Sequence, residues 1–337
     1  MGPELTTVAD DMAVAFAGVD VHRWEGLAPD EEHHIDGVQF RTLPTPPGER
    51  LAVVTTVNDV HFGETVCGHM DAGPLAGGPV FRSEPGGDPY PELMNRGAIA
   101  EMLTASPDAV VAKGDLTDGG TDEQYAAFLS AYGGAFGDRL HHIRGNHDAY
   151  RGQDMADTGP FTVSVPGALL AVIDTTIPRA TTGRFPTDQA EWLDTVAAEA
   201  DRPVLVFGHH HVWAPTSKSR PPTYFGISPD DSERLIEVVA RRRSIVGYFA
   251  GHTHRNRVRR FEQTGDVPWV EVACVKDFPG AWAEYRIHEG GVLQVMHRIS
   301  SPDALAWTEK TRGMFNGQYP GYAFGSLDDR CFAFGPR

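Results

Sequence analysis

Residues 140–148 read LHHIRGNHD, in which a short strand-like run, Leu140–Ile143, is followed by Gly145-Asn146-His147-Asp148. The glycine allows a sharp turn, and the three residues after it offer amide, imidazole and carboxylate groups. In open α/β sheets, ligands bind at the carboxyl ends of the strands. The stretch therefore predicts a strand of an α/β sheet with functional side chains at its end.

Four more polar clusters follow strand-like runs in the same way. They are Asp59-Val60-His61 after Leu51–Val57, Gly114-Asp115 after Asp108–Ala112, Gly208-His209-His210-His211 after Pro203–Phe207, and Gly251-His252-Thr253-His254 after Ile245–Phe249. Residues two apart in a strand face the same side, so we expect Asp59 and His61 to reach one metal ion. Nitrogen and oxygen donors without a thiolate suit Mn, Fe, Zn or Co better than Ca²⁺.

Strands and helices alternate from about residue 51 to residue 300, which favours an α/β fold. Helices are predicted at 94–104, 122–130, 188–200 and 232–242. Thr121 is expected to cap the second of these, and Asp188 and Glu191 have the spacing of a capping box. The late strands at 269–275, 283–287 and 292–297 have little helix between them, so we expect them to build a second, partly antiparallel sheet.

Three regions are predicted from the composition along the chain. Residues 1–50 form an extension, either a small β-structure packed on the body or an arm to a second subunit, and 51–300 form the main α/β domain, which carries the five clusters. Residues 301–337 form an aromatic-rich tail, which we expect to pack on the domain because exposed aromatic rings are costly. Residues 63–91 are rich in Gly and Pro and predict a long loop, which is typically functional or disordered.

The formal charge of −17 argues against a nucleic-acid duplex as partner. No apolar run is long enough to span a membrane, and no signal peptide is recognised in the sequence as given. Three widely spaced cysteines favour a reducing, cytoplasmic location. The oligomeric state stays open, a homo-oligomer included.

In this order, the five clusters resemble the calcineurin-like metallophosphoesterase superfamily, whose pattern is D-x-H, GD, GNH[DE], GH and GHxH; the resemblance covers about residues 51–280. It implies a two-sheet β-sandwich flanked by helices in four αββα layers, here with N-terminal and C-terminal additions. It also implies two metal ions, one held by Asp59, His61 and His254 and the other by Asn146, His209 and His252, with Asp115 bridging both.

The resemblance further implies that His147 and Asp148 are the catalytic residues. His147 would act as a general acid or stabilise the phosphoryl charge, and Asp148 would orient it. His210 would support the site or face the substrate, and His211 would be packed or exposed.

The motifs also indicate a substrate class. Gly119 stands where the phosphoprotein phosphatases have an Arg, and Asp118 stands where the purple acid phosphatases have a tyrosinate ligand. The compact motifs look more like bacterial class III cyclic nucleotide phosphodiesterases and glycerophosphodiesterase-like enzymes. We therefore expect hydrolysis of a small phosphodiester, a cyclic nucleotide among the candidates, by in-line attack of metal-bound hydroxide. The alternatives are a phosphomonoesterase or nucleotide pyrophosphatase with the same metals, and a binding protein of degenerate fold, which the complete ligand set disfavours.

Two groups of residues are candidates for contacting the substrate. Trp213, Tyr224 and Phe225 follow the histidine triplet, where they would either stack on a nucleobase or pack within the loop. The arginines at 255, 257, 259 and 260 would form either a solvated strand face or a phosphate-facing patch.

Overall fold

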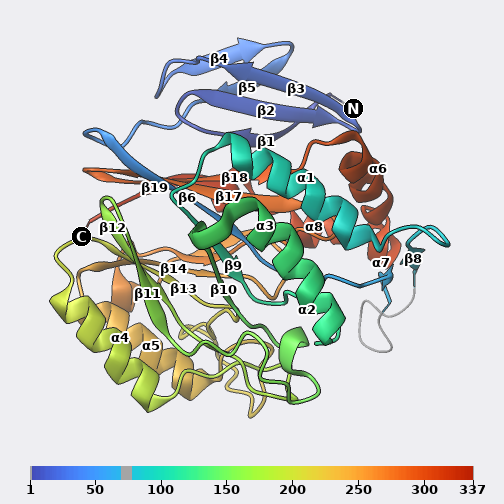
Figure 1. Cartoon of the computed structure of the whole chain (residues 1–337). Coiled ribbons are helices and arrows are strands. Elements are labelled where there is room, and N and C mark those ends of the chain that lie inside the picture. Colours follow the sequence, from blue (N-terminus) through green and yellow to red (C-terminus); the bar gives the residue numbers. More distant parts are fainter. Residues whose placement is uncertain (1, 70–77, 337) are drawn as a thin grey trace.

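Two six-stranded sheets form the body of the protein in this computed structural model, which describes residues 2–69 and 78–336. The first sheet has the order β10-β9-β6-β17-β18-β19 and the second β11-β12-β13-β14-β16-β15 (Figure 1). The first comprises β6 (Arg50–Val57), β9 (Ala109–Lys113), β10 (Leu140–Ile143), β17 (Ala281–His288), β18 (Gly291–Arg298) and β19 (Cys331–Phe334). The second comprises β11 (Phe161–Val165), β12 (Ala168–Val172), β13 (Val204–Phe207), β14 (Ile245–Ala250), β15 (Arg257–Arg259) and β16 (Trp269–Glu271).

Each sheet has a parallel part. Strands β6, β9 and β10 run parallel in the first sheet, and β12, β13, β14 and β16 run parallel in the second. The prediction that the late strands build the second sheet was wrong for β17 and β18. Strand β17 pairs antiparallel with β6 and places Ala283, Tyr285 and Ile287 in the same core as Val54. This apolar face is buried between the sheets, and antiparallel pairing with β6 and β18 places β17 in the first one.

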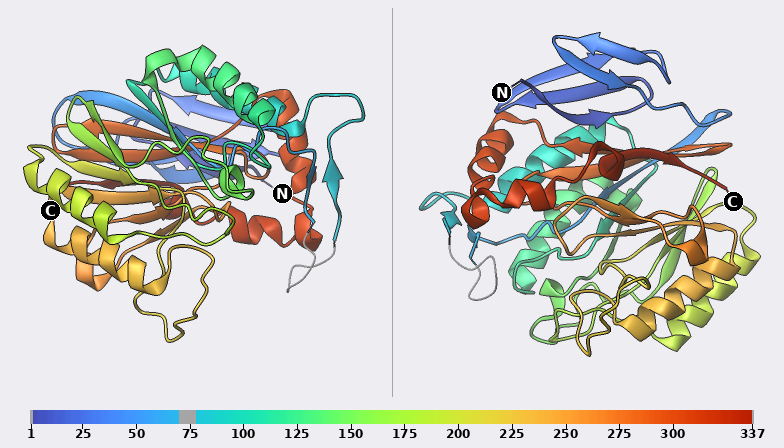
Figure 2. Two further views of the ribbon diagram at one scale, coloured as in Figure 1. Left: turned by 60° about the horizontal axis from the view of Figure 1, so that its bottom comes forward. Right: turned by 180° about the vertical axis from the view of Figure 1, so that it is seen from behind.

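The alternation of side chains in β9 shows how the layers stack. Ala109 and Val111 face the second sheet, whereas Val110 and Ala112 face the helices on the opposite side. Three of the apolar cores lie between these layers: one between the sheets, one between the first sheet and helices α1 and α6, and one between the second sheet and helices α4 and α5. Figure 2 shows the two sheets with helices on their outer faces. The predicted four-layer αββα fold is confirmed.

The helices begin and end close to the predicted positions. They are α1 (Tyr90–Thr104), α2 (Asp122–Phe128), α3 (Gly134–Phe136), α4 (Thr187–Glu199), α5 (Pro229–Arg241), α6 (Pro302–Thr311), α7 (Met314–Gly317), α8 (Tyr319–Ala323) and α9 (Leu327–Arg330), with a π-helical turn at Leu129–Gly133 and 3₁₀ turns at Gly137–Arg139, His147–Ala149 and Glu262–Thr264. Thr121 caps α2, as predicted, and it does so through a capping box with Gln124. The predicted capping box at Asp188 was wrong, because α4 begins one residue earlier, after Pro186, without a side-chain cap. Helix α5 begins three residues before its predicted start, because Ser228 caps it and Pro229 fits the first turn.

Smaller sheets from the N-terminal residues and from loop 63–91 lie outside the two main sheets. Residues before β6 form one sheet of β1 (Glu4–Val8), β2 (Met12–Ala17) and β3 (Asp20–Glu25), and another of β4 (Glu32–Ile35) and β5 (Val38–Arg41). Val14 and Phe16 of β2 pack with Leu293 and Val295 of β18. The predicted loop 63–91 contains the short strands β7 (Val66–Cys67) and β8 (Phe81–Arg82), and its residues 70–77 lie outside the described part.

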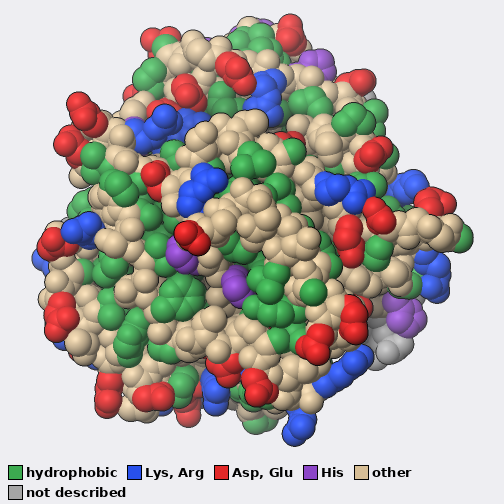
Figure 3. Space-filling model, viewed as in Figure 1, with side chains coloured by type: hydrophobic (Ala, Val, Ile, Leu, Met, Phe, Trp, Pro, Cys, Tyr) green, Lys and Arg blue, Asp and Glu red, His purple; other side chains and the backbone are tan. Residues whose placement is uncertain are grey.

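The surface carries both charge signs. On the face shown in Figure 3, Lys and Arg side chains are interspersed with Asp and Glu. Among the described helices, none is long and apolar enough to cross a bilayer.

Candidate metal centre and active site

The five polar clusters lie in loops that follow β6, β9, β10, β13 and β14, at the carboxyl ends of parallel strands. The backbone there is unusual. Positive φ angles occur at Asp59 (51°), His61 (45°), Asp115 (51°), His252 (67°) and His254 (56°). Residues other than glycine seldom adopt this left-handed conformation, and such strain collects at functional sites.

Asp59 and His61 do come together, but the prediction that they share one face of a strand was wrong. Strand β6 ends at Val57, so neither residue lies in a strand. The loop is held instead by backbone hydrogen bonds from the Asp59 N–H to the Gly114 carbonyl (3.1 Å) and from the His61 N–H to the Asp115 carbonyl (3.0 Å). These bonds join the first two clusters directly.

Asp59, His61 and His254 form the first group of metal-ligand atoms, all within 4.8 Å of one another. Asp59 Oδ1 lies 3.3 Å from His254 Nε2. Its other oxygen, Oδ2, accepts hydrogen bonds from Asn58 Nδ2 at 2.6 Å and from the His252 backbone N–H at 3.0 Å. One carboxylate oxygen is thus fixed by the protein, and the other faces the imidazole.

Asp115 lies between the two halves of the centre. Its Oδ2 is 3.6 Å from His61 Nε2 and 3.3 Å from His209 Nε2. Its Oδ1 accepts a hydrogen bond from the His147 backbone N–H at 2.9 Å. This central carboxylate therefore lies close to ligand atoms of both groups.

The second group centres on His209. Its Nδ1 donates to the Lys113 carbonyl at 2.8 Å, which leaves Nε2 free to bind a cation. Nε2 lies 3.1 Å from Asn146 Oδ1, and the ring centroid lies 5.2 Å from that of His252. Asn146, His209 and His252 therefore come together as predicted.

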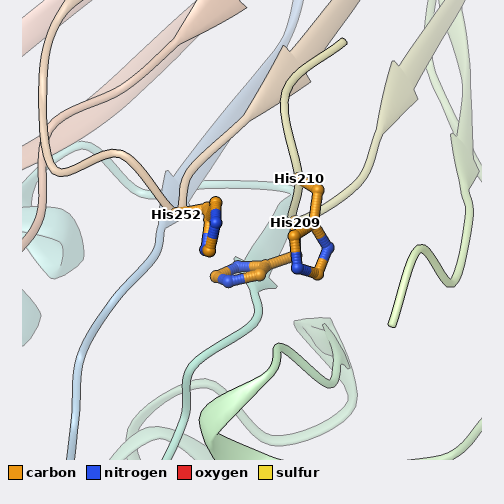
Figure 4. A group of neighbouring side chains, drawn as sticks. All are labelled: His209, His210 and His252. Carbon is orange, nitrogen blue, oxygen red and sulfur yellow. The ribbon is translucent and has the colours of Figure 1, made fainter. Parts of the chain in front are cut away.

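His210 also belongs to this cluster. Figure 4 shows the imidazoles of His209, His210 and His252 side by side, and their ligand atoms lie within 4.8 Å of one another. His210 Nδ1 is 2.8 Å from the Thr175 hydroxyl. His211 is buried rather than exposed, with Nε2 3.0 Å from the Tyr224 hydroxyl.

The donor set fits a pair of cations. His252 Nε2 is buried and has no hydrogen-bond partner among the described residues. Burial and the neighbouring charges of His210 and His209 lower the pKa of His252 well below its usual value, so this ring is neutral and offers a lone pair. Burial alone would raise the pKa of Asp59, but the charge and hydrogen bond of His254 hold it at about 2. A neutral imidazole beside an ionised carboxylate is what a divalent metal binds.

Gly145 allows the close approach around Asp115. A Cβ atom at this position would collide with Asp115 Oδ1 and lie 2.8 Å from His209 Nε2. The glycine in the third cluster is therefore required by crowding at the centre of the site rather than by the turn alone.

His147 lies beside the centre, with its ring centroid 4.2 Å from that of His61. The expectation that Asp148 orients this ring was wrong. His147 Nδ1 lies 2.6 Å from the Asp118 carbonyl, which accepts its proton. Asp148 is buried, and its two oxygens accept hydrogen bonds from backbone N–H groups of Leu116, Thr117 and Gly145. Asp148 thus holds the loops together, and Asp118 orients the imidazole.

Two further residues support the site and were not foreseen. Glu64 Oε2 lies 3.1 Å from His61 Nδ1, a contact that fixes the orientation of this imidazole. Lys276 Nζ lies 2.9 Å from Glu64 and 3.2 Å from Asp277, and its side chain is 6% exposed. Glu64 follows His61 by three residues, a spacing that a search for local partners could have noticed. Nothing in the sequence links Lys276 to it.

A cavity of about 420 Å³ opens beside the centre. It is lined by His61, Asp115, Asn146, His147, His252 and His254. Aromatic and apolar residues from distant parts of the chain also line it, among them Phe225, Met314 and Phe315. The cavity therefore combines candidate metal ligands with apolar side chains.

Only one of the predicted substrate-reading aromatic residues lines this cavity. It is Phe225, whereas Tyr224 contacts His211 and Trp213 is buried with its indole N–H on the Ser219 carbonyl. None of the four arginines for which a phosphate-facing patch was one alternative lines the cavity. Arg255 pairs with Glu271 at 2.8 Å, and the Arg259 guanidinium donates to the Val212 carbonyl.

The chain is similar to several known proteins. A protein named probable cyclic nucleotide phosphodiesterase from Synechococcus sp. is 27% identical over 168 residues, 47% of this chain and 62% of that protein. The glycerophosphodiester phosphodiesterase GpdQ from Enterobacter lignolyticus is 27% identical over 181 residues, 48% of this chain and 61% of that protein. The matched region spans about three fifths of the length of these two relatives.

The crystal structure of a dimetal phosphatase from Danio rerio has the same fold, with a TM-score of 0.56 and 15% identity over 74% of this chain and 98% of that one. The family described as calcineurin-like phosphoesterase matches residues 52–256, which include all five clusters. With its two sheets, its paired His/Asp groups and this match, the chain belongs to the calcineurin-like phosphoesterase family.

Proposed function

We propose that this protein is a two-metal phosphodiesterase that hydrolyses a small phosphodiester. The observation that carries the proposal is the position of Asp115, within 3.6 Å of His61 and 3.3 Å of His209, on the wall of a cavity of substrate size. Ions of Mn, Fe, Zn or Co suit these nitrogen and oxygen donors. Two such ions would supply a strong nucleophile at neutral pH and neutralise the phosphoryl oxygens.

The charge of the cavity favours a diester over a monoester. Among its described lining residues, the only Lys or Arg is Lys276, and its charge is already matched by Glu64 and Asp277. Residues 70–77 contain neither Lys nor Arg. A phosphomonoester is close to a dianion at neutral pH, and sites for such groups typically add arginine. A diester carries a single negative charge, which the metal centre can balance.

The chain's own groups then bind and orient the substrate. His147 lines the cavity and uses Nδ1 to contact the Asp118 carbonyl, so Nε2 is available to the phosphoryl group or to the leaving oxygen. Burial and the charge of His61 lower the pKa of His147 to about 4. A bound phosphoryl anion would favour the charged imidazole again.

The first test compares two substrates on one Mn²⁺-loaded sample, bis(p-nitrophenyl) phosphate and p-nitrophenyl phosphate. The proposal predicts a higher kcat/KM for the diester, and the same preference with Zn²⁺ or Co²⁺. Phe161→Leu, a change at a partly buried residue outside the cavity, serves as a control and should keep both rates. A preference for the monoester would make the protein a phosphomonoesterase and refute the proposal.

A further inference from the structure

The C-terminal segment 314–322 lies outside the family match, which ends at residue 256, yet it forms part of the active-site cavity. Met314, Phe315, Tyr319 and Tyr322 line the cavity together with the metal-ligand histidines. Part of the cavity wall is therefore supplied by residues outside the family match.

Two hydroxyl groups fasten this segment to the site. The Tyr322 hydroxyl donates to the Thr253 carbonyl at 2.9 Å, between the two histidines of the last cluster. The Tyr319 hydroxyl donates to Asp277 Oδ1 at 2.8 Å. The segment is thus fixed relative to the proposed metal ligands, as a wall that selects a substrate must be.

The backbone of the segment is strained at the cavity. Phe315 and Asn316 have φ angles of 52° and 56°, two consecutive left-handed residues that are not glycine. Such conformations are disfavoured and tend to persist where a side chain has to be held in one place. Here the strained turn carries Phe315, which lies on the cavity wall. Its ring meets that of Tyr319 edge to face, with 5.5 Å between the ring centroids.

A second aromatic ring lies on the metal side of the same cavity. Phe225 is 52% exposed, and its ring centroid is 4.1 Å from that of His252. A large apolar side chain that stays exposed beside a cluster of polar ligands is available to contact a bound molecule. The phosphoryl position and an aromatic face are therefore adjacent.

We propose that Phe315 and Phe225 are specificity-determining residues, and that the segment 314–322 selects phosphodiesters whose organic group is a nucleobase. The proposal rests on the phosphodiesterase function given above. A nucleobase has two flat faces, which stack on aromatic rings, whereas a glycerol or alkyl group gains much less from them. A volume of about 420 Å³ lies in the range of small-molecule sites and accommodates a phosphate with one base.

The experiment compares two diesters, adenosine 3′,5′-cyclic monophosphate and glycerophosphoethanolamine, on the Mn²⁺-loaded full chain. Phe315→Leu and Phe225→Leu keep an apolar side chain but remove the flat ring, whereas Phe315→Tyr keeps the ring. We expect each Leu variant to lower kcat/KM for the cyclic nucleotide at least about fivefold, mainly through KM, as loss of one stacking partner does. The rate with glycerophosphoethanolamine should fall less, so that the ratio of the two kcat/KM values shifts against the cyclic nucleotide, and Phe315→Tyr should recover this ratio. Inhibition by free adenosine, measured with bis(p-nitrophenyl) phosphate as substrate, should weaken in the Leu variants by the same factor.

Three outcomes separate the two proposals. If the wild type hydrolyses diesters but the Leu variants lower both rates equally, or lower neither, the specificity proposal is refuted while the phosphodiesterase proposal stands. If the wild type prefers glycerophosphoethanolamine, the nucleobase assignment is refuted. If it hydrolyses no diester, the proposed function itself fails. Phe225 is half exposed, so its Leu variant tests the idea even if the strained turn at Phe315 does not tolerate substitution.

Discussion

Replacing Lys276 by Met should strongly destabilise the protein, because two buried carboxylates lose the cation that lies between them. Lys276 Nζ is 2.9 Å from Glu64 and 3.2 Å from Asp277, and Glu64 and Asp277 are 8% and 2% exposed. At such distances and an effective dielectric constant of about 20, each contact corresponds to about 5 kcal/mol of Coulomb energy. Measured losses on removing one partner of a buried pair are about 3–5 kcal/mol, so we expect that range for K276M.

The assay is urea unfolding of the metal-free protein at pH 7, carried out as a double-mutant cycle with Glu64→Gln. The double variant K276M/E64Q should recover about 2 kcal/mol or more, because it removes one of the two unpaired charges. In metal titrations, E64Q alone should weaken binding about 10- to 100-fold, since His61 loses the group that orients it. If K276M lowers the free energy of unfolding by less than about 1 kcal/mol, and the cycle shows no coupling between Lys276 and Glu64, the reasoning is refuted and water solvates these charges.

Three further changes test other parts of the structure. Asp115→Asn keeps the shape of the side chain but removes its negative charge. We expect kcat to fall about a thousandfold, which corresponds to about 4 kcal/mol, the interaction energy of one pair of charges about 4 Å apart. A nearly normal kcat would argue against a bridging role. Gly145→Ala should weaken metal binding in a chelator competition and lower the free energy of unfolding by about 1–3 kcal/mol, because the new methyl group collides with Asp115. Burial alone would raise the pKa of Glu284, but His297 and Arg286 hold it at about 2. The stability it contributes is therefore present above its ordinary pKa and is lost as the pH falls toward 2. Urea unfolding should show a weaker pH dependence below about pH 4.5 for Glu284→Gln, and an unchanged one would contradict this account.

The sequence predicted the identity of the clusters well because two local signals coincide there. Apolar runs such as Ile245–Phe249 mark buried strands, and the Gly-His-x-His pattern after this run marks a turn with metal-binding groups. In a parallel arrangement the strand ends meet at one edge, so the clusters could be brought together without knowledge of the exact pairing. The assignment of Asp59, His61 and His254 to one metal ion came instead from the resemblance to the metallophosphoesterase superfamily.

Other features depend on contacts that local sequence does not encode. The left-handed backbone at Asp59 and His61 is stabilised by hydrogen bonds to a loop more than fifty residues away in the chain. The pairing of β17 with β6 joins residues more than two hundred positions apart in the chain, such as Ala283 and Thr56. The placement of Phe315 on the cavity wall depends on how the additions after the family domain pack on it. Each of these is decided by tertiary packing, which overrides local preference.

The central claim is that Asp115 joins two cations in one site, and magnetic coupling between two bound ions tests it directly. Metal-free protein is loaded with Mn²⁺, its metal content is measured, and its electron paramagnetic resonance spectrum is recorded. The account predicts two Mn²⁺ per chain with an exchange-coupled spectrum, since ions that share a carboxylate lie about 3.5–4 Å apart. A single Mn²⁺ per chain, or two ions with uncoupled spectra, would contradict it.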